Sequence, residues 1–209
     1  MSFRQPWKVK RNRFREFAHT SFTVFIGSLI MLIKQIDILV HPDFNQISVP
    51  NFPLHKLQLA VREKWEKRFN LLKDQDGAVL IYFSIMTLDE INQRLDDPSS
   101  ILDKIECEEI YRIKNLKEML GSRFILFGWF FPPSSEIIVK TFTSLGFTVV
   151  PEETEVYAYG EIFELCVWAW GNCVVTSLDV PLRNIIFSRG DSLTNDDGRK
   201  ISRWRFGGD

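Results

Sequence analysis

The chain has 209 residues, of which 45% are hydrophobic and 25% are charged, and its net charge is −1. This is the composition of a globular domain that can bury a core. It excludes a disordered chain, a collagen-like repeat and a polytopic membrane protein. Three cysteines are a low and odd number for a disulfide scaffold. The charge balance gives no specific signal for nucleic-acid binding.

The first 33 residues differ in charge and hydropathy from the remainder. Residues 1–20 contain six basic side chains and one acidic one, a net charge of +5, so the rest of the chain carries −6. Residues 22–33 then form an apolar run, shorter than the roughly 20 residues that span a bilayer. Three interpretations remain open. The segment is a basic arm that contacts an acidic or membrane surface, a first helix or strand packed on the domain, or a stretch outside the natural fold that ends before Met31.

Beyond this segment, short apolar runs alternate with longer amphipathic stretches. The apolar runs have the length and composition of strands, and they predict strands over residues 36–40, 78–83, 123–131, 147–150, 154–160 and 184–187. The stretches between them place apolar residues mainly at three- and four-residue steps, and they predict helices over residues 54–73, 88–95, 101–120, 134–145 and 162–175. Thr87 with Glu90 three residues later predicts a capping box, and Gly146 has the position of a glycine that ends a helix.

Alternation of strand and helix about five times is typical of a parallel sheet covered on both faces. We therefore expect a Rossmann-like α/β fold: a three-layer sandwich with a mostly parallel sheet of about five strands. The domain is expected over residues 34–190, with a basic and apolar N-terminal arm over residues 1–33 and a polar C-terminal tail over residues 191–209. The order of the strands in the sheet is not readable from the sequence.

Polar or aromatic residues follow most of the predicted strands. In open α/β sheets the carboxyl ends of the strands share one edge, where ligands bind. We therefore expect a small-molecule site there, with His41, Asp43 and Glu161 as catalytic residues. The expected ligand-binding residues are Ser84, Trp129 and Arg189.

All of these residues except Ser84 also have a structural interpretation. A His-Pro-Asp turn is a good way to end a strand, because the Asp side chain bonds nearby backbone N–H groups. Glu161 falls where a helix is expected to begin, and a carboxylate is favoured there by the helix dipole. Arg189 lies in a stretch typical of a turn, and Trp129 can pack beneath a loop.

Cys166 requires separate consideration. The stretch from Gly160 to Cys166-Val167 is similar in spacing to the nucleophile segment of isochorismatase-like cysteine hydrolases, and Asp43-Phe44 resembles the start of their first motif. That resemblance implies a cysteine nucleophile with an aspartate base and a lysine. The position of the aspartate is Leu39 here, and no lysine occurs in a matching context. Without these partners nothing activates the thiol, and Cys166 is expected to be a core residue.

Other chemistries lack their motifs. The chain has no G-x-G-x-x-G after a strand, no P-loop and no G-x-S-x-G elbow, so no cofactor is assigned. Its three histidines are isolated from one another, and no metal site is expected. The cysteines favour a reducing, cytoplasmic compartment.

Two functions remain. The first is a hydrolase or group-transfer enzyme that acts on a small molecule. The second is a non-catalytic module that docks on a protein or membrane surface through residues 1–33 and the aromatic loop after Trp129.

Overall fold

The computed structural model describes residues 30–42, 56–101, 104–128, 131–161, 166–188 and 204–205. These residues fold around a six-stranded sheet with the order β4-β3-β2-β6-β7-β8. Its strands are β2 (Gln35–Val40), β3 (Ala78–Ser84), β4 (Phe124–Gly128), β6 (Glu155–Gly160), β7 (Ile185–Phe187) and β8 (Trp204–Arg205). The first five strands in this order are mutually parallel, and β8 pairs antiparallel with β7.

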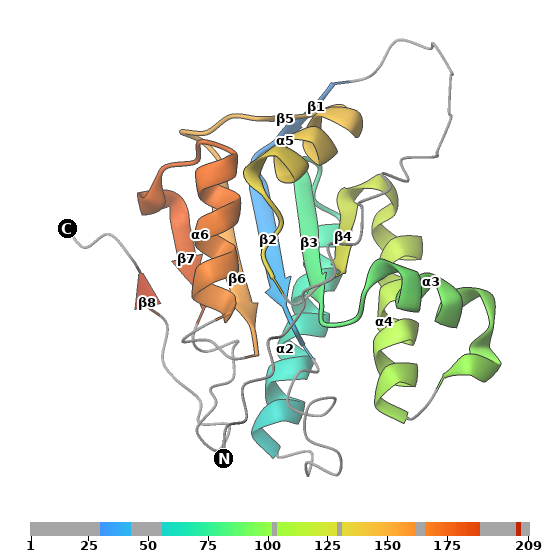
Figure 1. Cartoon of the computed structure of the whole chain (residues 1–209). Coiled ribbons are helices and arrows are strands. Elements are labelled where there is room, and N and C mark those ends of the chain that lie inside the picture. Colours follow the sequence, from blue (N-terminus) through green and yellow to red (C-terminus); the bar gives the residue numbers. More distant parts are fainter. Residues whose placement is uncertain are drawn as a thin grey trace, which may run out of the picture.

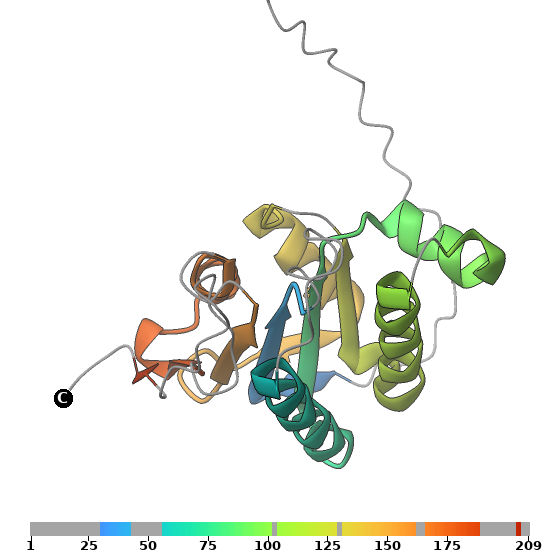
Figure 2. The same ribbon diagram turned by 90° about the horizontal axis from the view of Figure 1, so that it is seen from below.

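Helices cover both faces of the sheet, which confirms the predicted α/β sandwich. They are α2 (Lys56–Lys73), α3 (Leu88–Asp96), α4 (Lys104–Leu120), α5 (Ser135–Ser144) and α6 (Trp168–Ser177). Figure 2 shows α5 and α6 on one side of the sheet and α2 and α4 on the other. One hydrophobic cluster lies between the sheet and the α5/α6 pair, and a second lies between the sheet and α2, α3 and α4.

A separate pair of short parallel strands lies at the amino end of the main sheet (Figure 1). These are β1 (Met31–Ile33) and β5 (Phe147–Val149), so β5 does not pair with the main sheet. Ile33 is fully buried in the core beside α5, whereas Leu32 is 51% exposed. The described fold therefore includes residues 31–33, which belong to the predicted arm, and the pairing of β8 adds two residues of the predicted tail.

Local signals in the sequence correspond to local geometry. The Thr87 hydroxyl accepts a hydrogen bond from the Glu90 amide at 3.2 Å, and Glu90 accepts one from the Thr87 amide at 2.8 Å, which completes the predicted capping box. Gly146 follows α5 with a positive φ of 73°, as a helix-ending glycine does. The helix expected over residues 162–175 is described from Trp168, and this residue is 47% exposed although the sequence predicts a largely buried helix.

The strand order identifies where the winding of the chain reverses. From β2 the chain moves outward through β3 to β4, and it then returns to β6 on the opposite side of β2 (Figure 1). The carboxyl ends of β2 and β6 therefore flank a topological switch point, the place where open α/β sheets bind their ligands.

Candidate functional site at the switch point

His41 and Glu161 lie next to each other along the carboxyl edge of the sheet. They directly follow Val40 and Gly160, which are register partners on β2 and β6. The Glu161 amide donates a hydrogen bond to the Val40 carbonyl at 3.0 Å, and the His41 amide donates one to Phe83 at 2.8 Å. Both side chains are fully buried. The structure thus brings together two residues that are 120 positions apart in the sequence.

Backbone geometry at this point depends on one glycine. Gly160 has a φ of +144°, and a Cβ built on it would lie 2.1 Å from the Val40 carbonyl oxygen. No other residue type fits this close approach of two strand ends. His41 is also in the left-handed region, with a φ of +46°, which is uncommon for a residue with a side chain and occurs often at functional sites.

The His41 ring contacts the aromatic side chain of Trp170 on the α6 side of the sheet. Its centroid is 5.1 Å from that of Trp170, with the two planes at 75°. Trp170 in turn packs edge-on against Phe83 at 6.4 Å, and Phe83 stacks on Phe127 at 5.3 Å. The imidazole therefore lies between the carboxyl end of β2 and a group of aromatic side chains, Trp170, Phe83 and Phe127.

Ser84 ends β3 at the same edge, and its side chain is hydrogen-bonded to a residue of α4. Its hydroxyl donates to the buried Glu109 carboxylate at 2.5 Å and accepts from the Met86 amide at 3.0 Å. The sequence analysis did not identify Glu109. The sequence pattern could have indicated this residue, because Glu109 lies four residues from both Ile105 and Ile113, on the apolar stripe of α4.

The other expected site residues are Asp43, Trp129 and Arg189, and all three lie outside the described residues. Ser188, the residue before Arg189, is buried, and its amide donates to the Ala158 carbonyl at 2.9 Å. The end of β7 is therefore fixed against β6.

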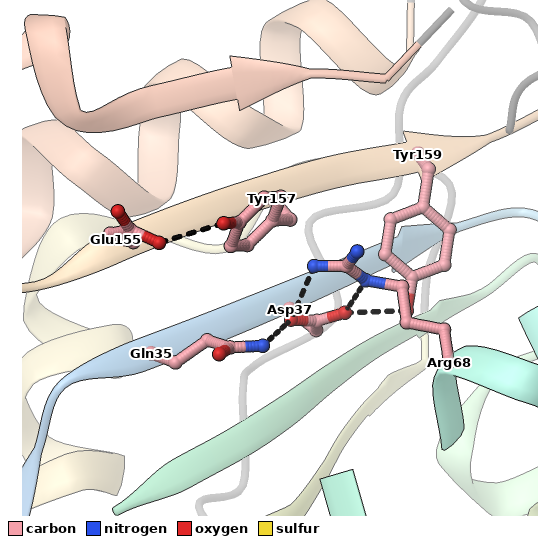
Figure 3. Close-up of polar contacts among 6 residues, drawn as sticks. All are labelled: Gln35, Asp37, Arg68, Glu155, Tyr157 and Tyr159. Carbon is pink, nitrogen blue, oxygen red and sulfur yellow. Dashed lines mark hydrogen bonds and ion pairs between the residues drawn. The ribbon is translucent and has the colours of Figure 1, made fainter. Parts of the chain in front are cut away.

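A second polar cluster, which the sequence analysis also missed, lies inside the sheet (Figure 3). Asp37 of β2 is fully buried. It accepts hydrogen bonds from Arg68 Nε, from Arg68 Nη2 at 3.1 Å, from Tyr159 at 3.0 Å and from Gln35 at 2.8 Å. The Arg68 guanidinium also stacks over the Tyr157 ring, 4.0 Å from its centroid. The sequence could have indicated Asp37, because it is a carboxylate between Ile36 and Ile38. A charge in a central strand requires a partner.

This cluster has the properties of a structural ion pair. Burial by itself lowers the pKa of the Arg68 guanidinium, but the charge and hydrogen bonds of Asp37 outweigh this effect and hold the pKa above its ordinary value. Asp37 pairs with Leu80 and Tyr157 in the sheet, three residues before the end of β2. The pair therefore anchors α2 to the sheet at a distance from the carboxyl edge.

Cys166 is buried in the apolar cluster between the sheet and the α5/α6 pair and is not activated. Burial raises the pKa of its thiol to about 11, so the thiol stays protonated at neutral pH. Burial also raises the pKa of Cys173, and its thiol is hydrogen-bonded to the Pro133 carbonyl at 3.3 Å. A protonated buried thiol is a poor nucleophile.

Other features of the described chain are separate from this edge. A groove of about 450 Å³ lies between α2 and α4, with Phe69, Leu116 and Met119 among its lining residues. It contains none of the expected site residues. In the described part of the chain, no cluster of three or more His, Cys, Asp or Glu side chains has the arrangement of a metal site. None of the helices among those residues is long and apolar enough to cross a membrane.

Comparison of the chain with protein-family models, with curated proteins and with solved structures finds no match in any of the three. The geometry of the switch point is therefore the evidence that bears on function.

Proposed function

We propose that this protein binds a small molecule at the switch point between β2 and β6 and carries out hydrolysis or group transfer there. The observation that carries the proposal is the position of His41 and Glu161. They are two fully buried polar side chains, adjacent in register, at the edge where the strand order reverses.

In this proposal His41 is the general acid and base, and Glu161 orients the imidazole or the substrate. Histidine suits proton transfer near neutral pH, because its ordinary pKa lies there. A site shielded from water also strengthens electrostatic interactions with a substrate. Burial of both side chains at the end of a rigid sheet supports such a role.

The test is retention of small molecules by equilibrium dialysis against the low-molecular-weight fraction of a cell extract, read by mass spectrometry. The wild-type protein should retain at least one compound that His41→Ala and Glu161→Gln both lose. Unfolding free energies should fall by no more than about 1–2 kcal/mol in these variants. Glu153→Gln is the matched control, because Glu153 is exposed at the opposite end of the sheet. Equal retention by all four proteins, or loss of folding in both site variants, would contradict the proposal.

A second candidate function is docking on a surface through the N-terminal segment. It is favoured by two exposed apolar residues at the start of the described chain, Ile30 at 67% and Leu32 at 51%, which continue the basic and apolar segment. Deletion of residues 1–30 tests it with vesicles that contain phosphatidylserine. Association that is lost on deletion supports docking, and a full-length chain that does not sediment with the vesicles excludes a lipid surface.

A further inference from the structure

Trp170 has a buried hydrogen-bond donor with no partner among the described residues. The residue is 5% exposed, and its indole Nε1 makes no hydrogen bond to them. Buried indole N–H groups almost always find an acceptor, because losing hydration without a replacement is costly. Trp168 lies two residues earlier on α6 and is 47% exposed, so its indole has solvent available instead.

This donor lies at the proposed site. Trp170 is in the first turn of α6, and its ring is the one that stands against His41 with 5.1 Å between centroids. Its other ring neighbour is Phe83, from the strand next to β2. The indole of Trp170 therefore packs against both Phe83 and the imidazole of His41.

We infer that Trp170 Nε1 donates a hydrogen bond to a carbonyl oxygen of the ligand, and that the ligand class is uncharged carbonyl compounds such as amides and esters. The inference rests on the proposed function and specifies the substrate class of that same site. Amides and esters are also common substrates of hydrolysis and group transfer, for which His41 is the proposed acid and base.

The surroundings of Trp170 favour an uncharged acceptor over an anion. A carboxylate or phosphate that leaves water needs several donors or a cation in return. The indole offers one neutral donor within a cluster of apolar side chains. The buried polar and charged residues of the described chain include neither lysine nor arginine, and His41 lies beside the acidic side chain of Glu161, which disfavours a second negative charge. One neutral donor matches one carbonyl oxygen.

The experiment compares benzamide with benzoate, two probes of the same shape that differ in charge. The indole Nε1–H signals are observed by ¹H–¹⁵N NMR, with Trp170→Phe assigning the signal of Trp170 and Trp168→Phe as the matched control on the same helix. Benzamide should shift the Trp170 signal saturably, and benzoate should not. The Kd of benzamide, followed by the His41 ring signals, should rise about tenfold in Trp170→Phe and stay unchanged in Trp168→Phe, as expected for one lost hydrogen bond.

The outcomes separate this inference from the proposed function. Tighter binding of benzoate, or shifts of the His41 signals without a shift at Trp170, would overturn the inference and leave the proposed site in place. If neither probe shifts the signals of His41 or Trp170, the inferred ligand class fails, whereas the proposed site fails only if the dialysis experiment also finds no compound that depends on His41 and Glu161. The titration of the wild-type protein gives these answers even if Trp170→Phe does not fold.

Discussion

The two faces of the sheet are built in different ways. On the side of α5 and α6, alternate residues of the central strands are apolar: Ile36, Ile38 and Val40 of β2, and Val79, Ile81 and Phe83 of β3. On the side of α2 and α4, the sheet also presents polar groups, and three of them are hydrogen-bonded to a helix. Arg68 of α2 binds Asp37, Arg112 of α4 donates to Tyr82 at 3.5 Å, and Glu109 of α4 accepts from Ser84.

This difference shows two sources of structural specificity. The apolar side is held by volume and burial, so it tolerates hydrophobic exchanges of similar size. The polar side is held by particular pairs, and removal of one partner leaves the other buried without it. The candidate site lies at the edge where both sides end.

The largest effect is expected for the ion pair inside the polar side. Arg68→Leu should lower the free energy of unfolding by about 3–5 kcal/mol, because it leaves the Asp37 carboxylate buried without its cation. The combined Asp37→Leu and Arg68→Leu variant should recover most of that loss. Urea denaturation measures both, with the exposed neighbour Lys67→Leu as control at less than about 0.5 kcal/mol. A double variant as unstable as Arg68→Leu would show that the pair does not act as a unit.

The second effect concerns the shared edge. Gly160→Ala should cost about 3 kcal/mol, because its Cβ would overlap the Val40 carbonyl oxygen and its φ of +144° is strained for alanine. Gly121→Ala is the matched control. It also has a positive φ, of 58°, but no atom lies within 4 Å of its Cβ, and it should cost about 1 kcal/mol. Equal losses of unfolding free energy in the two variants, measured by thermal denaturation, would mean that β2 and β6 do not approach each other as described.

The third effect compares two serines on opposite sides. Ser84→Ala should cost about 1–3 kcal/mol, because Glu109 loses a hydrogen bond in a buried position. Ser177→Ala on α6 should cost less than about 1 kcal/mol, because its hydroxyl bonds the Cys173 carbonyl one helical turn earlier and its other partner is the neutral hydroxyl of Ser135. Guanidinium denaturation of both variants measures the difference. The reverse order would contradict the distinction between the two sides.

The smallest effect is at the capping box of α3. Hydrogen bonds from the Thr87 backbone and side chain lower the pKa of Glu90 below its ordinary value. Glu90→Gln should therefore cost less than about 1 kcal/mol at pH 7, and this cost should vanish as the pH falls through the lowered pKa, where wild-type Glu90 becomes protonated. Stability curves at pH 7 and in acid measure it, with Asp89→Asn as a control for charge alone. A cost that persists in acid would mean that the carboxylate charge does not contribute.

The sequence predicted most of the fold because its signals are local. The alternation of strands and helices, the Thr87 capping box and the position of Gly146 each depend on residues close in the chain. The strand order and the separate β1–β5 pair depend on contacts between distant segments, which periodicity does not encode.

The candidate site was predictable only in part. The rule that parallel strands share a carboxyl edge was enough to select His41 and Glu161. The roles of Asp37 and Glu109 were missed because each was counted within an apolar run or helix stripe rather than as a charge that needs a partner. The contact of Trp170 with His41 was not foreseeable, since it joins a helix to a strand from a distant part of the sequence.

The most direct test of the account is a crystal structure of the protein soaked with a mixture of small uncharged fragments that contain carbonyl groups. The account predicts a fragment bound at the carboxyl ends of β2 and β6, in contact with His41. Fragments bound only in the groove between α2 and α4, with nothing at the end of β2, would contradict it.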